Sequence, residues 1–277
     1  MVPRAGLEPI SSRSAFDPES ASISYNLLYN NNMSISPNRE YGAVMPCGGK
    51  GDRLAALNPD LPKSLFKVAG KELIRYSVDC MDPDYVRQLV FAVGFGAERL
   101  EAWVHGYDLS QKVDISRQKE PGVLAAIEAG ATYITQDSFI ACNTDEIRRN
   151  MNLPNVIQFH ESTASIATML VTRASRLYRH RLITLGAKGL VVQTKLKPEE
   201  YAAQPEVTGL VNTGFLVIDK VALEYFDPSH SRDWSGIIDP LCEAGKLSAY
   251  VDERVNYFNV GTPEEYRDAA VYLEQNT

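Results

Sequence analysis

The sequence has no excess of basic residues, few cysteines and no long apolar run, and each absence excludes a class of protein. Its 277 residues include 28 Lys and Arg against 35 Asp and Glu, a net charge of −7, whereas sequence-independent binding of nucleic acid needs a basic face. No run approaches the roughly 20 apolar residues that span a bilayer, and the start lacks the apolar core of a signal peptide. We therefore expect a soluble protein that works without nucleic acid or membrane.

The cysteines point to the cellular compartment. Cys47, Cys80, Cys142 and Cys242 stand far apart, with no C-x-x-C pair and no Cys/His cluster. Neither a zinc site nor a disulfide framework is expected from this spacing. A reducing, cytoplasmic location is therefore predicted.

Residues 1–40 differ from the rest of the chain. They are rich in Ser, Asn and Pro and show no helical or strand periodicity, so they have little apolar surface to bury. We predict a disordered leader over 1–40 and one ordered domain over 41–277. Two alternatives stay open: translation starts at Met33, or the segment packs as an irregular arm.

From Tyr41 onward, short apolar runs typical of buried strands alternate with amphipathic helical stretches. This β-α-β order predicts an α/β fold, a single Rossmann-like domain with a mixed, mainly parallel sheet and its sites at the carboxyl ends of the strands. The strands are predicted at 42–47, 88–94, 113–117, 139–142, 165–172, 189–194, 213–218, 248–252 and 256–258, and the helices at 73–81, 97–105, 122–134, 234–244 and 263–276.

A glycine-rich loop follows the first strand. Gly48, Gly49 and Gly51 let the backbone approach a ligand closely, with amides free to face phosphate oxygens. The loop is not a P-loop, because Lys50 is followed by glycine and not by Ser or Thr. It is not a dinucleotide-binding G-x-G-x-x-G either, because Leu54 takes the third glycine position. By itself, a plain tight turn explains the glycines equally well.

Two cations near the loop strengthen the phosphate interpretation. Arg53 lies two residues past the last glycine, and Lys63 follows Pro62 in a segment that also contains Pro59; the prolines stiffen the chain there. Fixed cations beside a phosphate-binding loop suit phosphoryl or nucleotidyl transfer, in which charge grows on phosphate oxygens and on the leaving pyrophosphate. Solvated surface charge, the usual state of Lys and Arg, is the alternative.

The loop and the cations together resemble a known family. Gly48-Gly49-Lys50-Gly51-Asp52-Arg53-Leu54 and then Pro62-Lys63-Ser64-Leu65-Phe66-Lys67-Val68-Ala69-Gly70-Lys71 resemble the double motif of the sugar-1-phosphate nucleotidylyltransferases, of the mannose-1-phosphate guanylyltransferase and glucose-1-phosphate thymidylyltransferase type. The resemblance implies the nucleotide-diphospho-sugar transferase fold and a nucleotide site at the loop and Cys47. It also implies catalytic roles for Arg53, on the triphosphate and pyrophosphate, and for Lys63, on the α-phosphate. Asp52 departs from the pattern, which usually has Ser or Thr there.

Two more segments resemble the base and metal sites of this family. Gln118-Lys119-Glu120-Pro121-Gly122-Val123-Leu124-Ala125-Ala126 resembles Q-x-x-x-G-T-A-x-A, which implies that Gln118 bonds the base and Gly122 lets the base lie against the helix start. Asn143-Thr144-Asp145 resembles N-G-D, and Asn259-Val260-Gly261-Thr262-Pro263-Glu264 resembles D-x-G-T-P-E, which implies that Asp145 and Asn259 hold Mg²⁺. An ordinary loop before a packed helix is the alternative for the first segment. For Asp145 the alternative is the N-cap of a helix that begins near Glu146.

The sugar-phosphate site is implied by three shorter resemblances. Gly189 lies in K-G-L-V, Lys197 in L-K-P, which resembles E-K-P, and Asn212 in V-N-T-G-F, which resembles N-x-G. Leu196 stands where the family has a Glu that contacts sugar hydroxyls, so an unusual acceptor is expected. A surface position for Lys197 is the alternative. The four histidines fall outside these motifs, and surface or packing roles are favoured for them.

The resemblance implies in-line attack of a sugar 1-phosphate on the α-phosphorus of a nucleoside triphosphate, with Mg²⁺, to give a nucleotide sugar and pyrophosphate. No protein base is needed, because the attacking phosphate is ionised at neutral pH. The two substrates are the expected partners, and a homo-oligomer stays open. One alternative is a catalytically weakened homologue that senses these ligands or serves as a partner subunit, motivated by Asp52, Leu196 and Asn259. Another is a glycosyltransferase, for which Asn143-Thr144-Asp145 is only a near miss of D-x-D.

Overall fold

The computed structural model describes residues 39–54, 58–174, 181–195 and 209–276. The predicted leader therefore lies outside the described residues except for its last two, and so do Leu196 and Lys197. Within the described ranges, no helix is both long enough and apolar enough to cross a membrane.

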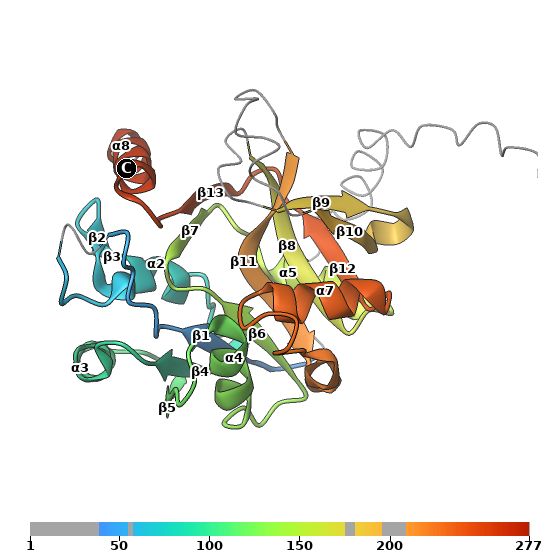
Figure 1. Cartoon of the computed structure of the whole chain (residues 1–277), viewed down its shortest axis with the longest axis horizontal. Helices are drawn as coiled ribbons and strands as arrows, with labels where there is room; N and C mark the ends of the chain where they lie inside the picture. Colours follow the sequence, from blue (N-terminus) through green and yellow to red (C-terminus); the bar gives the residue numbers. More distant parts are fainter. Residues whose placement is uncertain (1–38, 55–57, 175–180, 196–208, 277) are drawn as a thin grey trace, which may run out of the picture.

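A mixed sheet of nine strands, counted over the described residues, forms the centre of the molecule (Figure 1). Its main path runs β10-β9-β11-β6-β1-β4-β5, and β8 joins β11 to β12. β1 pairs in parallel with β4 and β6, and β4 with β5, whereas β11 is antiparallel to its neighbours. The strands are β1 (Tyr41–Pro46), β4 (Val86–Val93), β5 (Lys112–Arg117), β6 (Ser138–Cys142), β8 (Ala167–Ala174), β9 (Leu182–Leu185), β10 (Val191–Lys195), β11 (Gly209–Asp219) and β12 (Leu247–Val251).

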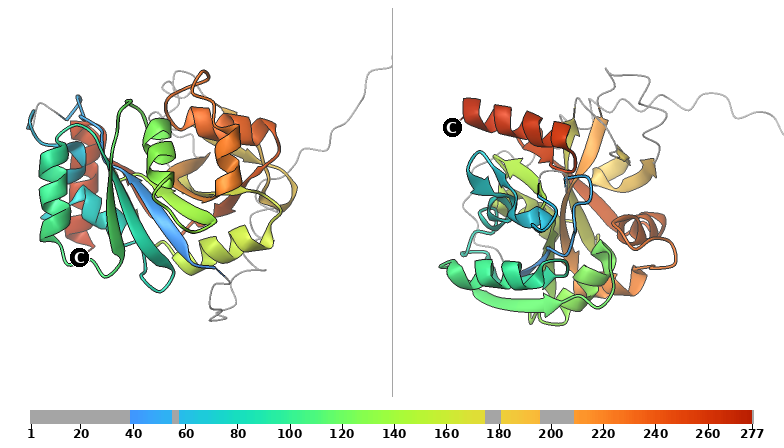
Figure 2. Two further views of the ribbon diagram at one scale, coloured as in Figure 1. Left: turned by 90° about the horizontal axis from the view of Figure 1, so that it is seen from below. Right: turned by 60° about the vertical axis from the view of Figure 1, so that its left-hand side comes forward.

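Helices cover both faces of this sheet (Figure 2). Along β1, Tyr41, Ala43 and Met45 join one buried cluster while Val44 joins the other, because successive side chains of a strand point to opposite faces. The first cluster is closed by α2 (Leu73–Val78), α3 (Ala97–Gly106) and α5 (Leu153–Ser162), and the second by α4 (Val123–Ala131) and α7 (Ser235–Glu243). The predicted Rossmann-like fold with its mixed, mainly parallel sheet is confirmed.

A third, smaller cluster of buried apolar residues packs together segments that contain predicted site residues. It joins Leu54 of the glycine loop to Phe66, Val68, Ile147 and Val260. The elements that supply it are the hairpin of β2 (Lys67–Val68) and β3 (Lys71–Glu72), the ribbon of β7 (Glu146–Arg149) and β13 (Asn256–Asn259), and α8 (Pro263–Gln275). Four segments far apart in the sequence are thus packed on one apolar centre.

Two local predictions were wrong or incomplete. The chain after Asp145 forms strand β7 and no helix, so the N-cap alternative for Asp145 is wrong. β7 pairs with β13, and its Ile147 is buried, so tertiary contacts decide the conformation of this short segment. Helix α5 was not predicted, although Asn152 caps it by accepting a hydrogen bond from the Asn155 amide and Pro154 lies in its first turn.

Candidate active site

The glycine loop and the predicted base-binding residue lie against each other at the carboxyl ends of β1 and β4. The Cys47 amide donates to Ala92 O at 2.8 Å, and the Gln118 amide donates to Val93 O at 2.8 Å. A Cβ on Gly48 would lie 1.6 Å from Gln118 Oε1, so a larger residue there would displace the Gln118 side chain. At Gly49 a Cβ would meet nothing within 4 Å, which leaves this part of the loop open to a ligand.

Gly122 completes this group. Gln118 Nε2 donates to Gly122 O at 3.1 Å, and Gly122 has φ of 113° at the start of α4, a region open mainly to glycine. A Cβ there would lie 2.5 Å from Arg232 O. The structure thus brings together Gly48, Gln118 and Gly122, three of the residues predicted to bind the nucleotide.

Lys63 lies behind the same loop and pairs with Asp145. Gly51 has φ of 69°, and a Cβ on it would lie 2.9 Å from Lys63 Cβ, so the loop packs directly on the lysine stem. Lys63 Nζ donates to Asp145 Oδ2 at 2.5 Å, with 11% of the Lys63 side chain exposed and 33% of the Asp145 side chain. Burial raises the pKa of Asp145, but the Lys63 charge and hydrogen bond, together with the Arg148 charge, hold that pKa below its usual value.

Two hydroxyl groups join these segments. Thr144 Oγ1 donates to Pro46 O at 2.6 Å, at the end of β1. Since that proton is used, Ser64 Oγ is the donor in its 2.7 Å contact with Thr144 Oγ1. Thr144 replaces a glycine of the family pattern, and its hydroxyl ties the Lys63 segment to the Asp145 segment.

Arg53 and Asp52 lie on the solvent-exposed side of the glycine loop. The Leu54 amide donates to Gly51 O at 2.7 Å, so residues 51–54 do form a tight turn, and buried Leu54 anchors it. Arg53 is exposed. Asp52 has 79% of its side chain exposed and pairs with Lys50 at 3.5 Å, so its charge is met by a neighbouring cation and solvent.

The β7–β13 ribbon brings the predicted metal residues to one edge. Asn259 is the register partner of Glu146, and the Val260 amide donates to Asp145 O at 3.2 Å. Asn259 also borders a hollow of about 540 Å³ between β13 and α8. The described ranges contain no group of three His, Cys, Asp or Glu side chains that could hold a metal. A carboxylate and an amide oxygen nevertheless fit Mg²⁺, which takes oxygen ligands and usually keeps waters and substrate phosphates.

The predicted sugar-phosphate residues are placed in part. Asn212 lies on β11 and is half-buried, and its Oδ1 accepts from the Gly214 amide at 2.9 Å. Gly189 has φ of 72°, and the space beside it is filled by Ala249 O and the Phe159 ring, so its backbone conformation and close packing favour glycine without any role in binding. Lys197 lies outside the described residues.

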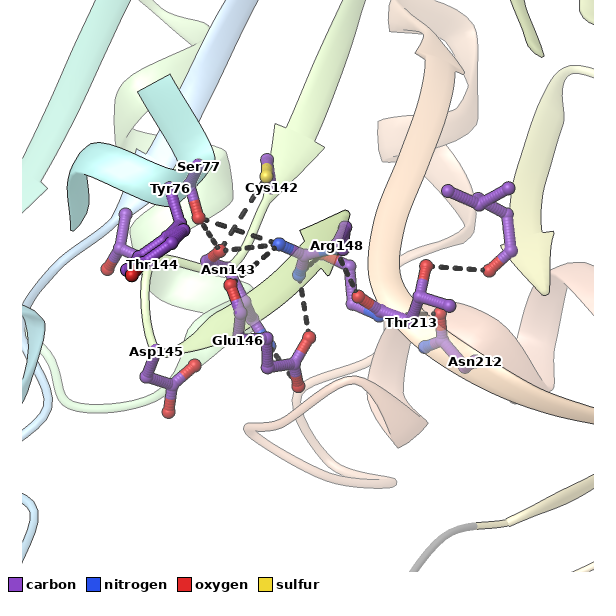
Figure 3. A network of polar contacts seen from close by, with 12 residues as sticks. Tyr76, Ser77, Cys142, Asn143, Thr144, Asp145, Glu146, Arg148, Asn212 and Thr213 are labelled. Atoms are coloured by element: carbon purple, nitrogen blue, oxygen red, sulfur yellow. Dashed lines mark hydrogen bonds and ion pairs between the residues drawn. The ribbon is translucent and has the colours of Figure 1, made fainter. Parts of the chain in front are cut away.

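The buried ion pair of Glu146 and Arg148 was not predicted from the sequence. Arg148 has a fully buried side chain, and its Nη2 donates to Glu146 Oε2 at 2.7 Å (Figure 3). Only the high share of charge in a segment next to a buried strand could have indicated it, and that pattern is more typical of solvent-exposed residues.

Comparisons with known proteins show the family of this chain. Residues 43–276 match the family described as "Nucleotidyl transferase". The chain is 24% identical over 243 residues to the mannose-1-phosphate guanylyltransferase catalytic subunit beta of Drosophila pseudoobscura pseudoobscura, covering 84% of this chain and 64% of the relative. It is 26% identical over 246 residues to the UTP–glucose-1-phosphate uridylyltransferase AglF of Haloferax volcanii, covering 85% of this chain and 97% of the relative.

A solved structure shows the same fold. HddC from Yersinia pseudotuberculosis aligns with a TM-score of 0.69 at 21% identity, over 84% of this chain and 99% of HddC. The chain spans 60% to 64% of the length of the guanylyltransferase beta subunits from the two Drosophila species and Danio rerio. The match over residues 43–276 confirms the resemblance to the sugar-1-phosphate nucleotidylyltransferases, and the chain belongs to the nucleotidyl transferase family.

Proposed function

We propose that this protein joins a nucleoside triphosphate and a sugar 1-phosphate into a nucleotide sugar and pyrophosphate, in an Mg²⁺-dependent reaction. The observation that supports this most is the position of Lys63. Its ammonium group lies 2.5 Å from the carboxylate of Asp145, while its stem lies under the glycine loop. A phosphate held by the loop would therefore meet a fixed cation and, directly beside it, a metal-binding carboxylate.

Each residue has a part in the proposed reaction. Amides of the loop hold the triphosphate, and Gln118 and Gly122 hold the base. Lys63 neutralises the α-phosphate as the sugar-phosphate oxygen attacks in line, and exposed Arg53 steadies the leaving pyrophosphate. Asp145 and Asn259 would hold Mg²⁺, which when bound neutralises phosphate charge. Asn212 orients the sugar, and the chain supplies positioning and charge rather than a nucleophile.

The same contacts argue against a protein that only senses its ligands. Asp52 raised that alternative, but its carboxylate is mostly exposed and paired with Lys50. The charge that Asp52 adds to the loop is therefore largely balanced. Asn259 supplies an oxygen ligand to the proposed metal site, but it lacks the negative charge that a carboxylate would supply there.

A pyrophosphate-release assay with and without Mg²⁺ tests the proposal. GTP with mannose 1-phosphate is the first pair to try, because several relatives are named mannose-1-phosphate guanylyltransferase; CTP or UTP with glucose 1-phosphate follow. We expect Asp145→Asn to lower turnover by about 10²-fold, as for loss of one transition-state contact. Asp114→Asn is the matched control, because Asp114 pairs with Lys112 at 2.9 Å away from the site. Ligand binding without pyrophosphate release from any pair would support the sensor instead.

A further inference from the structure

Strand β11 is irregular at the point where it carries the predicted sugar residue. Asn212 is the partner of Val171 on β8, and Leu216 is the partner of Met169. The step is thus four residues along β11 and two along β8, so β11 contains two extra residues. Such a bulge leaves backbone groups without partners on β8, although Gly214 O accepts from the Asn143 amide on the other side at 2.9 Å. Gly214, with φ of 62°, lies within it.

The side chain of Arg148 supplies donors to this bulge. Its Nε donates to Thr213 O at 2.5 Å, and its Nη2 donates to Gly214 O at 3.1 Å. The same guanidinium donates through Nη1 to Asn143 O at 3.2 Å. Figure 3 shows the planar group between the two chain segments, with Asp145 and Asn212 at its two sides. One buried cation thus bonds the carbonyl two residues before Asp145 and the carbonyls next to Asn212.

Glu146 closes the group. Its Oε2 accepts from Arg148 Nη2, and its Oε1 accepts from Asn143 Nδ2 at 3.3 Å. A Cβ on Gly214 would lie 2.0 Å from Glu146 Oε2, so the carboxylate fills the space that glycine leaves empty. The bulge, the glycine and the ion pair therefore fit one another as a unit.

Stability alone is a poor reason for such a pair. Desolvation of two charges offsets much of their attraction, and apolar residues of similar volume often stabilise a core as well or better. What apolar residues cannot do is hold two carbonyls of one segment and one carbonyl of another at fixed directions.

We propose that Arg148 is a positioning residue for the acceptor, fixing the bulge that carries Asn212 relative to the segment that carries Asp145. This inference rests on the proposed function. Asn212 Oδ1 is held by the Gly214 amide, which directs the Nδ2 hydrogens to another acceptor such as a sugar hydroxyl. A shift of the bulge would move the sugar, and its phosphate, away from the in-line position. None of the hydrogen bonds given above for Gly48 and Gln118 involves Arg148. Nucleotide binding at these residues should therefore be unaffected by a change at Arg148.

The test is a steady-state comparison of wild type with Arg148→Lys and Glu146→Gln. Lysine keeps the charge but cannot form the fork of hydrogen bonds. We expect kcat/KM for the sugar 1-phosphate to fall by about 10- to 100-fold, since a misplacement near 1 Å has such effects. The KM for the nucleoside triphosphate should stay within about 2-fold, because its contacts are unchanged. Glu146→Gln should also lower kcat/KM for the sugar 1-phosphate while leaving the KM for the nucleoside triphosphate unchanged. If Arg148→Lys does not fold, Glu146→Gln tests the proposal in its place.

Arg254→Lys is the matched control, because Arg254 makes a similar two-bond pair with Asp252, at 2.8 and 2.9 Å, and is half exposed. It should leave both parameters unchanged. The inference would be overturned if folded Arg148→Lys had unchanged kcat and KM values. It would also be overturned if kcat/KM fell equally for both substrates and in proportion to the fraction of folded protein. Wild-type turnover decides the proposed function separately. If it is absent, calorimetric binding of the sugar 1-phosphate and of the nucleotide to the same variants replaces the kinetic ratio.

Discussion

Replacing Lys63 with alanine tests the centre of the proposed site. The side chain is nine-tenths buried and its ammonium is 2.5 Å from Asp145 Oδ2, so the charge is held at a fixed position. Removing one fixed contact to a transition-state charge typically costs about 10²–10³ in kcat, or about 2.7–4 kcal/mol. We expect a loss in this range for Lys63→Ala.

Lys63→Ala should also destabilise the fold, but by less than the loss of one partner from a fully buried ion pair. Truncating one partner of a buried pair costs about 3–5 kcal/mol. Asp145 keeps a third of its side chain exposed, so water can solvate the carboxylate and about 1–3 kcal/mol is expected. The pKa of Asp145 is lowered by Lys63 against the effect of burial. A lowered pKa stabilises the fold above the unfolded value of about 3.9, and this contribution disappears as the pH falls through the folded pKa.

Two measurements separate the catalytic effect from the structural one. Urea unfolding at several pH values should show the largest difference between wild type and Lys63→Ala near pH 7, with the difference narrowing below about pH 4. Pyrophosphate release, measured where both proteins are folded, should show the loss of kcat. Lys67→Ala is the control, because Lys67 has 62% of its side chain exposed and pairs with Glu72 at 3.3 Å. Near-normal turnover of folded Lys63→Ala would refute the assignment of Lys63 to the α-phosphate.

Three further results are expected. Gly214→Ala should lower the free energy of unfolding by more than Gly245→Ala does, because both glycines have similar φ of 62° and 63° but only the first would place a Cβ against Glu146; equal losses in urea unfolding would contradict this. Cys47 should resist iodoacetamide at pH 8 in the native protein and react after unfolding, as judged by mass spectrometry, because burial raises the pKa of its thiol to about 12. Asn259→Asp should lower the Mg²⁺ concentration for half-maximal velocity, since a carboxylate binds the cation more strongly than an amide; an unchanged Mg²⁺ curve would remove Asn259 from the metal site.

The sequence predicted eight of the nine strands of the central sheet, and missed β9 (Leu182–Leu185), because most of these strands are locally encoded. The apolar runs near Val44, Val90 and Ile140 are buried on both faces, and such runs stand out between amphipathic helices. The family resemblance assigned Gln118 to the nucleotide site, but its contact with Gly48 was not predicted. The contact arises because the carboxyl ends of neighbouring parallel strands meet at one edge.

The ribbon that carries Asp145 was harder to predict. Its β7 strand reads Glu146-Ile147-Arg148-Arg149, with one apolar residue among four, and this pattern does not indicate burial. The strand exists because Ile147 enters the third cluster and the Arg148 guanidinium finds carbonyl partners on β11. Those partners are 65 and 66 residues away, so no local pattern could reveal them.

Departures from the family pattern have different consequences once their contacts are known. Thr144 is compensated, because its hydroxyl bonds Pro46 O and Ser64. Asp52 is compensated by Lys50. Asn259 is not compensated by its register partner, because Glu146 is already paired with Arg148. The weak point of the proposed enzyme is therefore metal affinity and not phosphate binding. A fully active enzyme and a weakened homologue should differ most at low Mg²⁺, where an amide ligand holds the cation less well than a carboxylate.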